Sequence, residues 1–219
     1  MAIVLLSVKL LEHSDMTKHR DKTEWISEIL AASRAEIDET GYSDFSMEAV
    51  VRRTGFSKGG IYRFFSNKSD VGLSLFAESY ESLLSFDVQD CLDWQLPMAD
   101  TVFRLMARYN RPEEGARQQD RIWIRLLPEV LNDVRFSTKR AELLTKIKLK
   151  FGDLFIALAR RDGLTVPVDF DEKFTNAFEL SEALLEGMAV QTALGSAIAH
   201  QGILVRAFID HVVKDIFRQ

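Results

Sequence analysis

The sequence has a single cysteine, Cys91, and only four histidines in 219 residues. One thiol cannot form an internal disulfide, so the fold is not held together by disulfide bonds. We interpret Cys91 as a small, half-buried apolar residue rather than a redox sensor. The cysteine and the histidines do not cluster at the spacings that zinc sites use. The sequence therefore predicts no metal site and no cofactor.

Proline and glycine are also scarce, with four prolines and eleven glycines. Because these residues mark turns and breaks, their scarcity between long segments of helical apolar period favours an all-α fold. A longer helix is expected to begin after Lys68, and further helices are expected over about residues 97–109, 118–132, 137–161, 170–194 and 197–217. Pro128 predicts a kink or an early end near Leu127.

No segment fits a membrane span or an export signal. The apolar run from Met1 to Val8 is too short to cross a bilayer, ends at Lys9 and has no small-residue cleavage site. Residues 1–17 are interpreted as an N-terminal extension, and either Met1 or Met16 is the physiological start.

The formal net charge of −5 is unusual for a protein that binds nucleic acid. The charge is unevenly distributed, because acidic and basic residues balance over residues 18–70, whereas the chain from residue 71 onward is acidic. Residues 51–69 contain no Asp or Glu but include Arg52, Arg53, Lys58, Arg63 and Lys68. This pattern favours an acidic body that carries one small basic patch and binds DNA through one face.

The stretch from Ser46 to Lys68 has the pattern of two short helices joined by a tight turn. Ser46 can cap the first helix, Gly55 gives the backbone freedom to leave it sharply, and Ser57 can cap the second. An aromatic residue before each cap pairs in spacing with an apolar residue inside the helix, Phe45 with Val50 and Phe56 with Ile61. The stretch therefore predicts a helix-turn-helix unit, braced by a first helix over residues 21–40 that ends at Gly41.

A competing pattern lies in the same residues. Gly55 to Gly59 fits G-x-S-x-G, the nucleophile elbow of α/β-hydrolases, with Ser57 as the nucleophile. That elbow needs a strand before it, whereas the residues before Gly55 have helical period and include Arg52 and Arg53. We therefore do not expect an enzyme.

Residues 29 to about 76 resemble the DNA-binding domain of the TetR family of bacterial transcription repressors. The residues that carry the resemblance are Ile29, Leu30, Ala32, Gly41, Tyr42, Ser46, Met47, Gly55, Phe56, Ser57, Lys58, Gly59, Ile61, Tyr62, Phe65, Lys68 and Leu73. The sequence departs from the family pattern at Val51 and Thr54, where alanine is usual, and at Asn67, which no proline precedes. These departures concern helix packing more than DNA binding.

The resemblance implies a role for each matching residue of the helix-turn-helix. It implies phosphate contacts from Ser46, Ser57, Tyr62 and Lys68. It implies base-edge or groove contacts from Lys58, Gly59, Gly60 and Arg63. The fold expected is an N-terminal three-helix helix-turn-helix DNA-binding domain, residues 18–68, followed by a larger C-terminal helical domain for effector binding and dimerisation, residues 69–219.

The resemblance implies that the C-terminal domain holds a small-molecule effector and a dimer interface. Apolar residues of the central helices that can line a pocket are Trp94, Phe103, Met106, Tyr109, Trp123, Leu127, Phe151 and Phe155. The last two helices are apolar on more than one face, which favours a partner helix. The dimer residues expected there are Phe178, Leu184, Leu185, Met188, Leu204, Phe208 and Val212.

We expect a cytoplasmic, nucleoid-associated regulator that binds double-stranded DNA as a homodimer. In this interpretation it represses from a palindromic operator and is released by a small-molecule effector. The alternative is a helical small-molecule-binding protein without DNA-binding activity. No membrane partner is expected.

Overall fold

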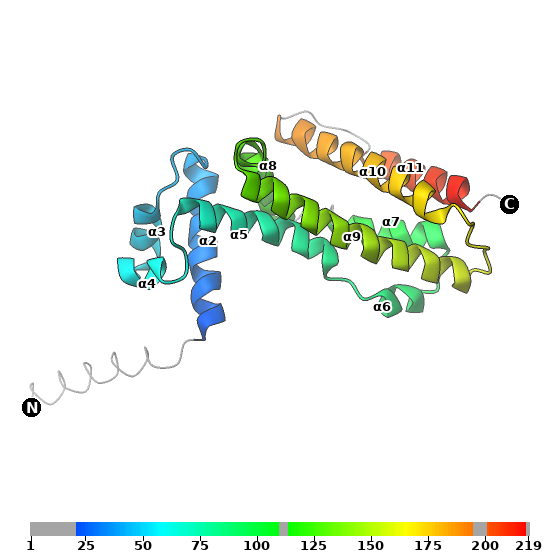
Figure 1. Cartoon of the computed structure of the whole chain (residues 1–219), viewed down its shortest axis with the longest axis horizontal. Coiled ribbons are helices and arrows are strands. Elements are labelled where there is room, and N and C mark those ends of the chain that lie inside the picture. Colours follow the sequence, from blue (N-terminus) through cyan, green and yellow to red (C-terminus); the bar gives the residue numbers. More distant parts are fainter. Residues whose placement is uncertain (1–20, 110–113, 195–200, 218–219) are drawn as a thin grey trace, which may run out of the picture. The chain divides into compact units, whose positions relative to one another are not determined.

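The computed structural model describes residues 21–109, 114–194 and 201–217, and every regular element within these ranges is a helix (Figure 1). This confirms the all-α prediction. The N-terminal extension, with Met1 and Met16, lies outside the described residues. The chain divides into two compact units, and the boundary after Val71 falls within helix α5, Lys68–Glu81.

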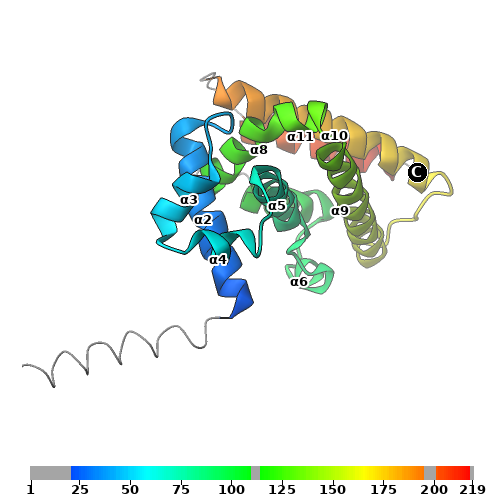
Figure 2. The same cartoon turned by 60° about the vertical axis from the view of Figure 1, so that its left-hand side comes forward.

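The first unit contains α2 (Lys22–Thr40), α3 (Met47–Thr54) and α4 (Lys58–Tyr62), as Figure 2 shows. Helix α2 ends at Gly41, whose φ of 85° suits glycine. The core of this unit is apolar and includes Ile29, Leu30, Ile37, Phe45, Val50 and Ile61. Helix α3 packs against both α2 and α4.

The predicted caps of the helix-turn-helix are confirmed. The Ser46 hydroxyl accepts a hydrogen bond from Ala49 N at 3.2 Å, and Ser57 Oγ accepts one from Gly60 N at 3.1 Å. Gly55 has the left-handed conformation, with φ 69°. Helix α4 spans only 5 residues and is shorter than the two turns expected. Its paired glycines lower its helix propensity, which is consistent with this short length.

The second unit continues through a short 3-10 helix into a helical body. Its further elements are η1 (Ser82–Leu84), α6 (Val88–Asp93), α7 (Met98–Tyr109), α8 (Glu114–Asn132), α9 (Val134–Arg161), α10 (Phe170–Ala193) and α11 (Gln201–Ile216). Helix α9 packs against α6, α8 and α10, and α11 packs against α7 and α10. Helix α6 was not predicted, although Asp87 caps it by accepting a hydrogen bond from Gln89 N.

Pro128 predicts a kink or an early helix end near Leu127, and the early end is wrong. Helix α8 continues past Pro128 to Asn132, and the Asn132 amide donates a hydrogen bond to Pro128 O at 2.7 Å. Pro128 is exposed, so its ring has room on the solvent side. Buried Leu126 and Trp123 hold the opposite side of the helix, and this packing outweighs the local cost of the proline.

Candidate functional site

Aromatic packing fixes the turn between α3 and α4. The Trp25 ring of α2 lies with its centroid 4.1 Å from that of Phe56 and 6.4 Å from that of Phe64. Phe56 stands in the turn before the Ser57 cap, and Phe64 follows α4. The start of α2 therefore supports the short helix α4 from both of its ends.

The basic residues of this unit are not equally available to a ligand. Arg53 Nε lies 2.5 Å from Glu36 Oε2, and Arg53 also pairs with Glu39, so its charge is offset within the protein. Lys68 Nζ donates a hydrogen bond to Ser43 O at 2.8 Å. Arg52, Arg53 and Arg63 are all exposed. The sequence argument treated these cations alike, whereas the structure gives Arg53 and Lys68 partners within the protein.

The two glycines at the start of α4 differ in what surrounds them. A Cβ atom on Gly60 would lie 3.1 Å from Ser57 Oγ, the capping atom of the helix, so an internal contact accounts for this glycine. A Cβ atom on Gly59 would meet nothing within 4 Å, and the residue is exposed. No contact among the described residues therefore requires glycine at position 59.

Lys58, the first residue of α4, pairs with a carboxylate of α3. Its Nζ lies 3.2 Å from Glu48 Oε1 and 5.5 Å from the centre of the Tyr62 ring. A hydrogen bond to its own backbone N–H and the Lys58 ammonium lower the pKa of Glu48. The hydrogen bond to Glu48 raises the pKa of Lys58. Both groups are therefore charged at neutral pH.

The residues predicted to contact DNA belong to one unit and lie at the ends of its short helices. Ser46 and Ser57 are the N-caps of α3 and α4, and Lys68 begins α5. Ser57, Lys58, Gly59 and Arg63 are exposed, whereas Ser46, Gly60, Tyr62 and Lys68 are partly buried. All eight are at least partly exposed, as contact with DNA requires.

The predicted effector residues have different neighbours in the second unit. Trp94 lies under the Arg104 guanidinium at 4.6 Å, and Phe103 lies 5.8 Å from that of Arg206. Phe151 meets Phe86 and Phe155 meets Phe174, each with ring centroids 5.1 Å apart. Met106 and Leu127 are partly buried, and the side chain of Tyr109 lies outside the described residues. The partners in these ring contacts, Arg104, Arg206, Phe86 and Phe174, lie outside the predicted set.

The remaining predicted residue, Trp123, belongs to a polar network. Its Nε1 donates a hydrogen bond to the Tyr80 hydroxyl at 2.6 Å, although both residues are more than nine-tenths buried. The Arg140 guanidinium also interacts with Tyr80, and Arg140 pairs with Glu186. The network thus links α5, α8, α9 and α10 within the helical body. Periodicity cannot reveal it, because its members come from four separate helices.

Glu182 lies beside this network and should make stability depend on pH. Burial, together with the Glu186 and Glu179 carboxylates, raises its pKa from 4.5 to about 7, although Arg140 opposes the shift. Between these values the folded chain binds more protons than the unfolded chain, so the free energy of unfolding falls as pH rises from 4.5 to 7. Glu182→Gln should flatten this fall in thermal melts from pH 4.5 to 8.

The effect of Glu182→Gln is compared with that of Glu142→Gln, which removes an exposed carboxylate from α9. The melting temperature of Glu182→Gln relative to wild type should rise as pH increases, whereas that of Glu142→Gln should not change. Parallel pH curves for wild type and Glu182→Gln would show that the carboxylate is not held protonated.

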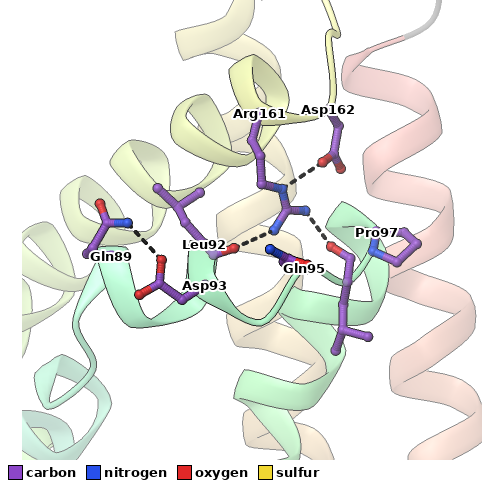
Figure 3. A pocket seen from close by; sticks show the side chains of 8 residues that line it. Gln89, Leu92, Asp93, Gln95, Pro97, Arg161 and Asp162 are labelled. Atoms are coloured by element: carbon purple, nitrogen blue, oxygen red, sulfur yellow. Dashed lines mark hydrogen bonds and ion pairs between the residues drawn. The ribbon is translucent and has the colours of Figure 1, made fainter.

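An open depression of about 820 Å³ lies where α6 and the start of α7 meet the end of α9 (Figure 3). Its lining residues are Gln89, Leu92, Asp93, Gln95, Leu96, Pro97, Arg161 and Asp162. The Arg161 guanidinium donates to Leu92 O at 3.3 Å, to Leu96 O and to Asp162 Oδ1 at 2.7 Å. Asp162 Oδ2 in turn accepts a hydrogen bond from Met98 N at 3.0 Å. The Arg161 and Asp162 side chains therefore hold the loop between α6 and α7 by hydrogen bonds.

Arg161→Ala should lower the free energy of unfolding by about 1–3 kcal/mol, because partly buried carbonyls lose a charged donor. A change of this size lowers the melting temperature by several degrees in a protein of this length. Arg160→Ala, which alters the exposed neighbour, is the matched control and should melt like wild type. Equal melting temperatures for the two variants would contradict this role.

Helices α10 and α11 each present an exposed row of small and apolar residues. On α10 these are Leu180, Ala183 and Gly187, with Leu194 directly after the end of the helix, and on α11 they are Ile203, Leu204 and Ala207. We call these residues the exposed stripe. Leu180 is 58% exposed, Leu194 73% and Ile203 66%, which are large values for apolar side chains. The spacing of three or four residues along α10 puts its members on one side of that helix.

The exposed stripe differs from the dimer residues predicted from sequence. Leu204 belongs to both sets. Phe178, Leu184, Leu185 and Phe208 are partly buried, and Met188 and Val212 are buried within the protomer. Sequence alone showed that these helices are apolar on several sides, but it could not tell which side the protomer covers.

None of the described helices combines the length and the apolar character needed to cross a bilayer. The described residues also contain no group of three or more His, Cys, Asp or Glu side chains placed to hold a metal ion.

Residues 29–75 match the family model of the bacterial regulatory proteins of the TetR family. No curated protein sequence is significantly similar to the chain. Among solved structures, Salmonella enterica GusR has a TM-score of 0.69 at 16% identity, over 90% of this chain and 100% of that one. A TetR-family transcriptional regulator from Mesorhizobium loti has a TM-score of 0.65 at 16% identity, over 90% and 97% of the two chains.

A transcriptional regulator from Saccharomonospora viridis, solved in complex with choline, has a TM-score of 0.56 at 16% identity and covers 88% of this chain and 97% of its own. At these identities the likeness shows the fold. The family match covers residues 29–75, which include α3 and α4 with their caps. Over residues 29–75 the chain matches the DNA-binding domain of the bacterial regulatory proteins of the TetR family, and its fold resembles that of solved TetR-family regulators.

Proposed function

We propose that this protein represses transcription by binding a palindromic operator as a homodimer, and that a small-molecule effector releases it. The observation that carries the proposal is the exposed start of α4, where Gly59 leaves the backbone open beside Lys58 and the Ser57 cap. Backbone N–H groups at a helix start bind phosphate or lie against a groove. Lys58, Gly59, Gly60 and Arg63 read the groove, and Ser46, Ser57, Tyr62 and Lys68 hold the phosphates.

The exposed stripe supports the homodimer. Two copies related by a two-fold axis would cover the stripe of each with that of the other, and small residues such as Ala183 and Gly187 allow close approach. A two-fold dimer also explains why the operator should be palindromic, with half-sites about 34 Å apart.

The helical body is the proposed effector domain. The proposed lining residues are those predicted from the sequence, namely Trp94, Phe103, Met106, Tyr109, Trp123, Leu127, Phe151 and Phe155. The Tyr80 hydroxyl adds a polar group beside Trp123. The choline complex of the Saccharomonospora viridis protein supports an effector site in a body of this fold. An effector that favours the released state by about 2.7 kcal/mol lowers DNA affinity a hundredfold.

The alternative proposal is a helical ligand-binding protein that does not use DNA. The internal ion pairs of Arg53 and Lys58 favour it, because they reduce the free positive charge of the first unit.

Binding to the DNA immediately upstream of the protein's own gene distinguishes the two proposals. The regulator should bind one fragment with nanomolar affinity, resist random competitor DNA and lose affinity as salt rises. Equal affinity for this fragment and random DNA, with no enriched site in the rest of the genome, would favour the ligand-binding protein.

A further inference from the structure

Helix α4, which the proposed function assigns to DNA, has little internal support for its orientation. It spans only 5 residues and contains Gly59 and Gly60, which are poor helix formers. Its N-cap contributes one hydrogen bond, from Gly60 N to Ser57 Oγ at 3.1 Å. Among the residues of α4, Ile61 is the buried one. A helix this short is not stable alone, so contacts from outside α4 must fix the direction in which it points.

The indole ring of Trp25 makes such contacts at three places along α4. Its centroid lies 4.1 Å from that of Phe56, before the helix, and 6.4 Å from that of Phe64, after it. Within the helix, a Cβ atom on Gly60 would lie 3.8 Å from Trp25 Cζ3, so the ring lies against backbone that carries no side chain. Contacts before, within and after a short helix restrain both its tilt and its rotation.

Trp25 belongs to a helix that is itself well anchored. Helix α2 is 19 residues long, and Asp21 is its N-cap. Ile29 and Ile37 of α2 are fully buried in the core of the first unit, and α2 packs against α3. The indole ring therefore holds a short helix in place from a long and well-packed one.

We propose that Trp25 is a positioning residue that holds α4 at the angle needed to read a base sequence. Base edges are recognised by directed hydrogen bonds and close contacts, which a change in helix angle misaligns. Attraction to phosphates is less sensitive to this angle, because it depends mainly on the number of cations near the DNA backbone. Loss of the ring should therefore weaken specific binding more than non-specific binding.

This inference rests on the proposed function and adds a residue outside the predicted DNA contacts. Its test is Trp25→Leu, which keeps an apolar side chain on α2 and removes the ring. The operator probe is the palindrome that wild-type protein enriches from a randomised pool of double-stranded DNA. The random probe is a duplex of the same length with a shuffled sequence.

The affinity of Trp25→Leu for the operator probe should fall about thirtyfold, and its affinity for the random probe should fall no more than about threefold. The ratio of operator to random affinity then falls about tenfold, which corresponds to the loss of one base contact. Trp25→Phe removes less of the ring and should give an intermediate ratio. Circular dichroism checks the fold, and Trp25→Phe carries the test if Trp25→Leu does not fold.

Ile37→Val is the control for a loss of stability. It removes a buried methyl group from the same helix, about 18 Å along the axis from Trp25. This variant should melt at a lower temperature than wild type but keep the operator-to-random ratio within about twofold. Titrations well below the melting temperatures compare folded proteins.

A wild-type ratio in folded Trp25→Leu would overturn the inference. An equal loss of affinity for both probes would also overturn it, and so would an equal fall of the ratio in Ile37→Val, because each indicates a general loss of structure. Wild-type protein that enriches no palindrome would overturn the proposed function itself. The selection with wild-type protein therefore distinguishes the two failures.

Discussion

Gly59→Leu should abolish operator binding, with a loss of at least about a hundredfold, while the protein folds at least as stably as wild type. A Cβ atom at position 59 meets nothing within 4 Å, so the leucine side chain adds no internal clash. Replacing glycine inside a helix gains up to about 1 kcal/mol of helix propensity. The same side chain would separate the α4 backbone from DNA, and lost close contacts to phosphate and base edges are worth several kcal/mol.

Thermal melting and operator titration together check this prediction. Gly59→Ala should show a smaller loss of affinity than Gly59→Leu, because it adds a single methyl group. Ala31→Leu, which enlarges an exposed residue of α2, is the control for added apolar bulk and should bind like wild type. Wild-type affinity in Gly59→Leu would remove the start of α4 from the DNA interface.

Ala183→Glu should convert the proposed dimer to a monomer and lower operator affinity by at least about a hundredfold. Ala183 is exposed at the middle of the stripe on α10, so the protomer itself should fold normally. In a two-fold interface the substitution places two uncompensated carboxylates against apolar surface, and burying one unpaired charge costs about 3–5 kcal/mol. Operator binding then falls because two linked half-site contacts become independent ones.

Sedimentation velocity measures the oligomeric state, and circular dichroism checks the fold. The matched control is Ala141→Glu, which introduces the same charge at an exposed alanine of α9 and should stay dimeric. A dimeric Ala183→Glu protein with normal operator affinity would place the interface away from the exposed stripe.

The sequence predicted the helix-turn-helix well because its signals are local. Ser46, Gly55 and Ser57 each act on the backbone within a few residues, and the structure gives them the predicted cap geometry. Pro128 shows the limit of local rules, since buried neighbours on α8 outweigh its effect. Helix α6 was missed because it is only 6 residues long and has too few turns for a clear apolar period.

The electrostatics of the site could not be predicted in the same way. Lys58 pairs with Glu48 at 3.2 Å, and Lys68 donates a hydrogen bond to Ser43 O at 2.8 Å. In both cases the partner belongs to another helix or loop. Tertiary packing brings such groups together, and spacing in the sequence does not encode it. The exposed stripe could not be predicted from the sequence for the same reason, because the other helices of the body determine which side of α10 and α11 is buried.

Selection from a randomised pool of double-stranded DNA tests the central claim most directly, because it needs no prior choice of operator. Wild-type protein should enrich one palindrome with half-sites about one helical turn apart, at roughly 34 Å, and Gly59→Leu should enrich none. A pool that shows no enriched sequence with wild-type protein, at salt low enough for binding, would contradict the account of this protein as an operator-binding regulator.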